Sequence, residues 1–325
     1  MITLHDISEP IEQNLQEFTV YLDELLSSDL DLVNSIVNYQ SGTKGKQIRP
    51  MLVLLSALLF ENINIKTYKA AGMVELCHTA TLMHDDVIDE ADIRRGVNTI
   101  NNVWNNKLAI LIGDYYFAKA FIKPIQYNNI EFLQVLINSI KHIIDGELLQ
   151  IQKSTEIDLT ENTYYKIIND KTASLISSSC KLGAISAGAE KSDCEKLEEF
   201  GYNIGMAFQI RDDILDYIGD FKITGKKPGN DLKEKKLTLP LIYALKQIDE
   251  KQANNYLALI KGDNLQTQDI KEIIDFVLKM GGIDYAQNKA NDFIEKAIQL
   301  MNNFKDSPAK TSLTNFAYFI VDRQK

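Results

Sequence analysis

Residues His78 to Asp89 read HTATLMHDDVID, and they end a stretch of helical character that begins near Ile65. On a helix with about 3.6 residues per turn, Asp85 and Asp89 lie nearly on one line, and His78 lies two turns earlier on the same face. We therefore predict a long helix whose final turn brings carboxylates together.

A second motif of the same form ends another predicted helix, in the stretch FQIRDDILD at 208–216. The first motif contains Asp85, Asp86 and Asp89, and the second contains Asp212, Asp213 and Asp216. A single acidic cluster is more often a solvated surface, but two copies within apolar sequence argue for a shared task. Partly desolvated carboxylates repel one another, and hard cations offset this cost. Because Mg²⁺ completes its shell with water and substrate phosphates, the motifs predict a magnesium site for a phosphate-bearing substrate.

Apolar residues recur at helical spacing along most of the chain, and strand-like alternation is missing. We expect two helices within 9–39, about five after Pro240, and others over 48–60, 65–89, 106–122, 130–152, 160–187 and 195–217. Residues 219–236 contain Gly, Pro and Lys, which predicts a mobile connection that acts as a lid. Helical patterning continues on both sides of it, so we expect one all-α domain over residues 1–325.

Composition and charge exclude several classes of protein. Of the 325 residues, 45% are hydrophobic and 25% are charged, which is typical of a globular protein with a core. The net charge of −10 opposes binding to nucleic acid. The longest apolar run, 51–60, is shorter than the roughly 20 residues of a membrane span. With three cysteines, no C-x-x-C pair and no signal-like N-terminus, we expect a cytoplasmic protein without a disulfide framework.

Basic residues near the acidic motifs fit a phosphate-bearing substrate. They are Lys46 and Arg49 beside Gly45, Arg94 and Arg95 after the first motif, Lys171 before Thr172, and Lys226 and Lys236 in the predicted lid. Any one of them is more often a surface cation, but as a set they predict phosphate binding.

Taken together, these residues resemble the trans-type polyprenyl diphosphate synthases. The resemblance spans nearly the whole chain and rests on GKQIRP at 45–50, HTATLMHDD at 78–86, RRG at 94–96, GD at 113–114, GE at 146–147, KTA at 171–173, FQ at 208–209 and TLP at 238–240. The ending IVDR at 320–323 is similar to that of bacterial members that make octaprenyl diphosphate. The resemblance implies a large helical bundle around a central cavity, and a homodimer.

The resemblance also implies a role for each residue that matches the family pattern. The residues that bind Mg²⁺ directly would be Asp85, Asp89 and Asp212, with support from Asp86, Asp213 and Asp216. The residues that bind the allylic diphosphate would be Arg94, Lys171, Lys226 and Lys236. The residues that bind isopentenyl diphosphate would be Lys46, Arg49, His78 and Arg95. Thr172 and Gln209 would face the reacting carbons.

The implied reaction explains why these residue types are needed. Cleavage of the allylic carbon–oxygen bond leaves a carbocation and a diphosphate, so the main demand is for positive charge on the leaving group. The cation then adds to the double bond of isopentenyl diphosphate, and loss of a proton, which the departing diphosphate could accept, gives a product five carbons longer. We therefore expect a Mg²⁺-dependent prenyltransferase.

Chain length is predicted from the helix that precedes the first motif. Ala80 and Thr81 stand where bulky aromatic residues of some family members form a floor that stops elongation. We therefore expect a long product, octaprenyl diphosphate for quinone side chains, with a floor among Phe132, Leu133, Leu136 and Ile140. The alternatives are a synthase of farnesyl or geranylgeranyl diphosphate, a terpene cyclase, which would lack the Lys46, Arg49 and Arg95 set, and a noncatalytic subunit, which would have lost aspartates.

Overall fold

The computed structural model describes residues 2–41, 45–94, 96–126, 129–156, 160–219, 228–262 and 265–323, apart from the side chains of Ser41 and Glu156. Arg95 and Lys226 lie outside these ranges. The first half contains α1 (Leu4–Ser8), η1 (Glu9–Ile11), α2 (Glu12–Leu26), α3 (Asp31–Ser41), α4 (Ile48–Leu58), α5 (Ile65–Ile88), β1 (Ile93–Arg94), β2 (Val97–Asn98), α6 (Ile100–Val103), α7 (Asn106–Gln126) and α8 (Ile130–Glu156). The second half contains α9 (Glu161–Ile168), η2 (Asn169–Ala173), α10 (Ser174–Ala187), α11 (Lys191–Ile218), α13 (Asn230–Lys233), α14 (Leu239–Leu245), α15 (Glu250–Lys261), α16 (Thr267–Lys279), α17 (Gly282–Met301) and α18 (Pro308–Asp322).

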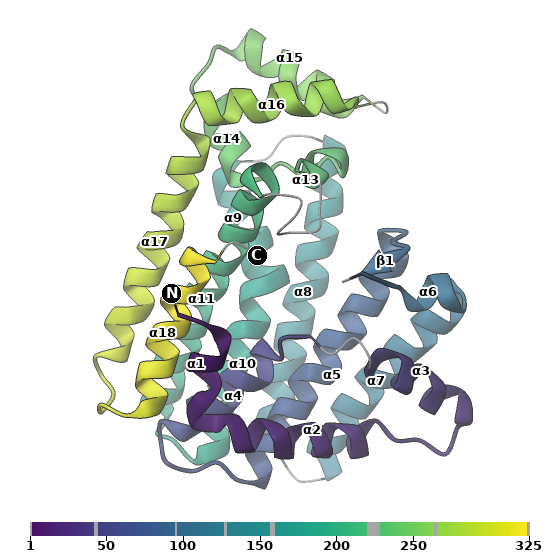
Figure 1. Cartoon of the computed structure of the whole chain (residues 1–325), viewed down its shortest axis with the longest axis vertical. Helices are drawn as coiled ribbons and strands as arrows, with labels where there is room; N and C mark the ends of the chain where they lie inside the picture. Colours follow the sequence, from purple (N-terminus) through teal and green to yellow (C-terminus); the bar gives the residue numbers. More distant parts are fainter. Residues whose placement is uncertain are drawn as a thin grey trace.

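The long helices form a bundle in which α4 and α10 are the most enclosed (Figure 1). Every residue of α4 from Pro50 to Ala57 is buried. Helix α10 packs against α4, α5, α8 and α11, and α11 packs in turn against α17. Helix α10 tolerates this crowding because its sequence, SLISSSCKLGAISA, consists largely of small residues.

The helices with the acidic motifs have well-defined ends. Asn64 caps α5, accepting a hydrogen bond from the backbone N–H of Lys66 at 2.8 Å. At the other end, Asp89 caps α5, and its N–H donates to the carbonyl of Asp85 at 2.8 Å. The last turn of the helix therefore presents the first motif. Helix α11 likewise ends two residues after Asp216, with Gly219 as its cap.

The helical predictions are confirmed in type and order. Helices α2 and α3 occupy the opening segment, and α14 to α18 are the five helices of the C-terminal third. A short antiparallel hairpin was not predicted: β1 pairs with β2 in the register Ile93–Asn98 and Arg94–Val97, and Gly96 has φ of +81° at the turn. Part of the predicted lid, 220–227, lies outside the described residues, and the described remainder contains the short helix α13. Within the described ranges, no helix is both long and apolar enough to cross a membrane.

Candidate active site

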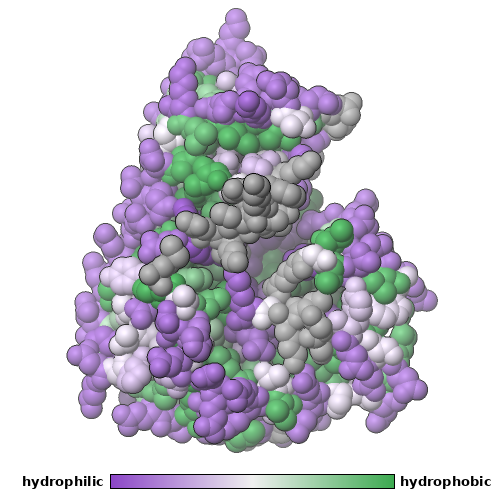
Figure 2. Space-filling model, in the orientation of Figure 1, coloured by the Kyte–Doolittle hydropathy of each residue, from purple (hydrophilic) through white to green (hydrophobic). Residues whose placement is uncertain are grey.

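The two acidic motifs lie at the ends of α5 and α11, near a notch in the molecular surface. Figure 2 shows this notch between the part of the molecule that carries α13 to α16 and the part that carries β1 and α6. A cavity of about 150 Å³ lies at the second motif. It is lined by Gln150, Lys153, Ser154, Tyr164, Ile167, Ile168, Lys171, Thr172, Gln209, Asp213, Asp231, Lys235, Lys236, Leu237 and Thr238.

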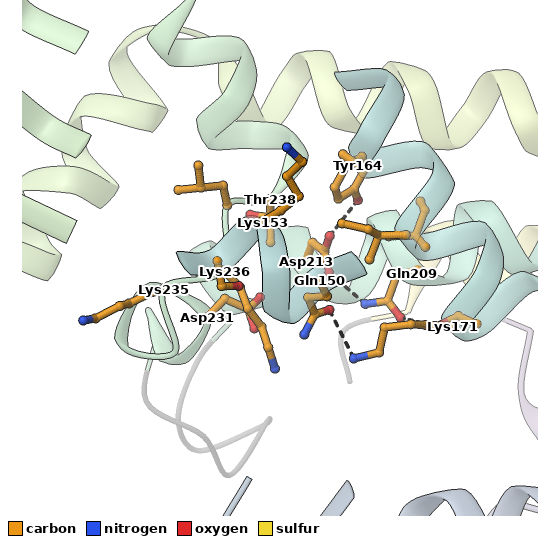
Figure 3. Close-up of a pocket in the computed structure, with 15 residues that line it drawn as sticks. Gln150, Lys153, Tyr164, Lys171, Gln209, Asp213, Asp231, Lys235, Lys236 and Thr238 are labelled. Carbon is orange, nitrogen blue, oxygen red and sulfur yellow. Dashed lines mark hydrogen bonds between the residues drawn. The ribbon is translucent and has the colours of Figure 1, made fainter. Parts of the chain in front are cut away.

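Hydrogen bonds fix the polar side chains of this cavity in a chain (Figure 3). The hydroxyl of Thr172 donates to Gln209 Oε1 at 2.8 Å, and Gln209 Nε2 donates to Asp213 Oδ1 at 2.8 Å. The Tyr164 hydroxyl donates to the other oxygen of Asp213 at 2.6 Å. The predicted pair of Thr172 and Gln209 is therefore brought together, with its amide and hydroxyl dipoles at the cavity wall.

Lys171 connects this cavity with the first motif. Its ammonium group contacts Glu147 Oε2 at 2.5 Å and donates to Gln150 Oε1 at 3.1 Å. Burial raises the pKa of the Asp85 carboxyl to about 6; the charge of Lys171 acts against this shift, and the charges of Glu147 and Asp89 add to it. Lys171 and Glu147 are therefore close enough to the first motif to affect the pKa of Asp85.

Lys236 has an equivalent place on the other side of the cavity. It contacts Glu234 Oε2 at 2.5 Å, and it also lies in the electrostatic field of Asp89 and Asp231. Burial by itself lowers the pKa of Lys236, but these acidic neighbours, Glu234 above all, outweigh burial and raise it. Lys236 therefore lies between the end of α5, which carries Asp89, and α13, whose first residues bind Asp216 at the end of α11.

Several aspartates of the motifs have protein partners. Asp86 is 7% exposed and accepts a hydrogen bond from Arg94 Nε at 2.5 Å. Asp216 accepts from the backbone N–H groups of Asn230 and Asp231 at 3.2 and 3.1 Å, and so caps α13. Burial, followed by the charge of Asp231, holds the pKa of Asp213 well above its usual range, although Tyr164 and Gln209 oppose the shift. These three aspartates are therefore held by neighbouring protein groups, and their supporting role at a metal stays a prediction.

A second, larger cavity of about 560 Å³ lies on another face of α5. Its lining includes Lys46, Arg49, His78, Asp86, Arg94, Phe208 and Arg323, and apolar side chains such as Leu22, Leu26, Leu76 and Tyr116. Arg49 Nη1 lies 3.0 Å from His78 Nε2. The predicted isopentenyl diphosphate ligands Lys46, Arg49 and His78 therefore line one cavity, and their role in binding stays a prediction. Arg94 also lines this cavity and binds Asp86, and its predicted contact with the allylic diphosphate stays a prediction.

Arg323 is a site residue for which the sequence analysis assigned no chemistry. One of its terminal nitrogens donates to Asp212 Oδ1 at 2.5 Å and to the carbonyl of Phe208 at 2.9 Å. Its guanidinium lies 3.9 Å from the centre of the Phe208 ring. Arg211 binds the carbonyl of Arg323 through two nitrogens, at 3.2 and 2.8 Å. A predicted metal ligand, Asp212, therefore has a cationic partner in this structure.

Other residues of the site were also missed. They are Glu147, Gln150, Tyr164, Asp231 and Glu234. A single acidic or amide side chain in a helical sequence cannot be distinguished from a solvated one, so only the resemblance to GE at 146–147 gave a signal.

The carboxylates are suited to a hard divalent cation. The donors are oxygen atoms only, and the raised pKa of Asp85 shows that neighbouring acids and burial disfavour its charge when no cation is present. Among the residues that the structure describes, no three acidic, histidine or cysteine side chains are gathered closely enough to hold a metal alone.

The residues predicted to set chain length lie in the core next to the site. Ala80 has no exposed surface, and Thr81 donates to the carbonyl of His78 at 2.8 Å. Neither residue lines the two cavities. On α8, Phe132, Leu136 and Ile140 are buried in the same hydrophobic cluster as Ala80, so the path past them stays a prediction.

Comparison with known proteins identifies the family. The family model described as polyprenyl synthetase matches residues 30–277. The chain is 36% identical to the all-trans-nonaprenyl-diphosphate synthase (geranyl-diphosphate specific) of Rhodobacter capsulatus, over 98% of this chain and 97% of that protein. It is 32% identical to the octaprenyl diphosphate synthase of Escherichia coli, over 100% of each.

The fold agrees. A polyprenyl synthase from Caulobacter crescentus, crystallised with calcium and isoprenyl diphosphate, superposes with a TM-score of 0.93 and 30% identity, over 99% of this chain and 98% of that one. The chain belongs to the polyprenyl synthetase family. The predicted all-α fold and prenyltransferase activity are thereby confirmed.

Proposed function

We propose that this prenyltransferase adds isopentenyl diphosphate repeatedly to an allylic diphosphate, such as farnesyl diphosphate, and makes a long all-trans product, octaprenyl diphosphate for quinone side chains. The observation that carries the proposal is the arrangement of charge. Lys171 and Lys236 line one cavity with Asp213 of the second motif, and they interact with Asp85 and Asp89 of the first. A second cavity with cationic residues is lined by Asp86 of the first motif. A terpene cyclase binds no second diphosphate and has no need of this second cavity.

In this proposal, the cavity of Lys171 and Lys236 receives the allylic diphosphate. Mg²⁺ held by Asp85, Asp89 and Asp212 would supply the positive charge that stabilises the diphosphate as it leaves. The two lysines add fixed cations to the same oxygens. Thr172 and Gln209 direct their dipoles at the allylic carbons.

The second cavity receives isopentenyl diphosphate. Lys46, Arg49 and His78 bind its diphosphate, and Arg94 fixes Asp86 between the two sites. Arg95 and Lys226, which the resemblance implies as further ligands, stay predictions. The proton lost after addition goes to the departing diphosphate, so no protein base is required. Holding both substrates in register supplies much of the rate.

We propose long-chain specificity because Ala80 and Thr81 leave the helix face beyond Asp85 without a bulky side chain. The growing tail would then pass along α5 toward the buried face of α8 around Leu136. The relatives from Rhodobacter and Escherichia are named for nonaprenyl and octaprenyl products, which supports this length class.

We also propose that the protein works in the cytoplasm as a homodimer of single-domain subunits. An exposed apolar stripe supports the dimer: on α8 it contains Ile137, Ile144, Leu148 and Ile151, and on the adjacent α7 Ile110, Leu111, Ile122 and Ile125. The α8 residues share one face of the helix. We expect the double variant Ile144→Asp/Leu148→Asp to sediment as a monomer in analytical ultracentrifugation; a wild-type mass would exclude this surface.

A product assay tests the function. Purified protein is incubated with Mg²⁺, isopentenyl diphosphate and farnesyl diphosphate, and the product masses are measured by mass spectrometry. A C40 chain is expected, and EDTA should prevent its formation. A C15 or C20 product would identify a shorter-chain synthase, a cyclised hydrocarbon from the allylic substrate alone would identify a cyclase, and no condensation would indicate a noncatalytic subunit.

A further inference from the structure

The segment that carries Lys171 and Thr172 is not a regular α-helix. Helix α9 continues through η2 into α10 without a break, but η2 is a π-turn: the N–H of Ser174 bonds to the carbonyl of Asn169, five residues earlier. Such turns are rare and occur often at functional sites. Lys171 and Thr172 both lie within it, so whatever fixes this turn also fixes the two side chains at the cavity.

The residue before Lys171 is an aspartate whose side chain is 1% exposed. Its Oδ1 lies 3.1 Å from His142 Nδ1 on α8 and accepts from Asn169 Nδ2 at 2.8 Å. Its Oδ2 accepts from Lys166 Nζ on α9 at 2.6 Å. The carboxylate of Asp170 is therefore saturated by donors from α8, from α9 and from the turn itself.

The donors reach this carboxylate from the surface. The side chains of His142 and Lys166 are 50% and 60% exposed, whereas Asp170 is enclosed. A buried carboxylate is tolerated only where hydrogen bonds and opposite charge replace its water. Neither Asp170 nor any of these three donors lines the cavity of Lys171, so Asp170 acts on the turn and not on the ligand.

Two glycines hold the backbone of the turn from opposite sides. A Cβ on Gly146 of α8 would lie 2.8 Å from Asp170 Cβ and 3.0 Å from the backbone nitrogen of Lys171. A Cβ on Gly205 of α11 would lie 2.6 Å from Ala173 Cα. Packing this close leaves the turn little room to shift, but van der Waals contacts have no directional preference. Asp170 adds the directional bond that selects one rotation of the turn.

We propose that Asp170 is a positioning residue for prenyl transfer. By binding His142 and Lys166, it orients the π-turn so that Lys171 meets Glu147 and Gln150 at the allylic diphosphate, and Thr172 meets Gln209. The inference rests on the proposed roles of Lys171 and Thr172. Its physical basis is that a displacement of about 1 Å in a catalytic group reduces the rate by roughly a hundredfold.

Steady-state kinetics with Mg²⁺ and both substrates test the proposal on the full chain. We expect Asp170→Ala to lower kcat by ~10- to 100-fold and to leave the KM for isopentenyl diphosphate within about twofold, because that substrate binds in the other cavity. The control is Asp306→Asn. This change breaks the ion pair between exposed Asp306 and Lys310, which lie four residues apart. A kcat for Asp170→Ala equal to that of the control would overturn the proposal.

A double-mutant cycle separates positioning from general stability. In a Lys171→Met background, Asp170→Ala should lower kcat by less than about threefold, because the lysine that Asp170 positions is already gone. Equal losses in both backgrounds would show that Asp170 acts by another route and would refute the proposal. A Lys171→Met enzyme with wild-type kcat would instead refute the proposed role of Lys171.

If Asp170→Ala does not fold, the exposed donor His142 provides the test. His142→Leu removes the hydrogen bond, whereas His142→Gln keeps a donor at this position. We expect His142→Leu to reduce kcat several-fold with little change in Tm, and His142→Gln to recover most of it. Equal kcat values for the two variants would contradict the proposal.

Discussion

Arg323 and Asp212 form an ion pair that must change when a cation binds the second motif. The Arg323 side chain is 7% exposed and that of Asp212 is 42% exposed. We consider Arg323→Gln, which removes the charge and keeps a polar side chain of similar length. Arg323→Lys is the matched control, because it keeps the charge.

The cost to the metal-free protein follows from the interactions that the substitution removes. A hydrogen bond to a charged group contributes ~1.5–3 kcal/mol, and a cation–π interaction contributes ~0.5–2 kcal/mol. Water recovers part of this at the exposed Asp212, so we expect a loss of about 1–2 kcal/mol. For 325 residues, the entropy of unfolding is about 0.7 kcal/mol/K, and the expected fall in Tm is about 2–3 °C.

The effect on metal binding has the opposite sign. In the wild type, part of the binding energy of the cation is used to separate Asp212 from Arg323. Without that competitor, the apparent Kd for Mg²⁺ in the presence of inorganic diphosphate should fall by up to about tenfold, since 1.4 kcal/mol is a factor of ten. Isothermal titration calorimetry measures this Kd, and Arg323→Lys should stay near the wild type. An unchanged or weaker Mg²⁺ affinity in Arg323→Gln would refute the reasoning.

Three further outcomes are expected. Ala80→Tyr should shorten the product without abolishing activity, and mass spectrometry of an unchanged product would count against the proposed tunnel. Tyr164→Phe removes the hydroxyl that donates to buried Asp213, so Tm should fall by a few degrees and kcat should drop; a calorimetric scan identical to the wild type would contradict this. Because the folded-state pKa of Asp85 is raised to about 6 from its ordinary value of 3.8, its contribution to stability is present at low pH and is lost as pH rises through about 6. Thermal scans against pH should therefore show stabilisation by Mg²⁺ that grows as pH rises through about 6 and then levels off, and a pH-independent effect would exclude Asp85 as a ligand.

The sequence predicted the features that depend on local periodicity. Helices such as α5 and α11 are long and regular, so their spacing and the last-turn position of Asp85 were readable without the fold. A common role for Lys46, Arg49 and His78 was implied by resemblance alone, and the structure shows that these residues line one cavity.

Features that depend on contacts between distant segments were not predictable. Asp212 and Arg323 are 111 positions apart, and no pattern connects them. The hairpin β1–β2 is too short to show alternation, so the direction of Arg94 toward Asp86 was missed. No pattern connects His142 with Asp170 either, because the two become adjacent only when the π-turn packs against α8.

Helix α8 carries two sets of side chains that are neighbours in sequence. Leu148 follows Glu147, which pairs with Lys171, and Ile151 follows Gln150, which lines the cavity of Lys171, so each of these polar residues is next to an exposed apolar one. If two copies of the chain meet along this stripe, the same helix forms both the interface between subunits and a wall of the cavity in each subunit. Dilution that separates the subunits would then make this wall less rigid. The activity per subunit would fall, while the rest of the bundle would stay folded.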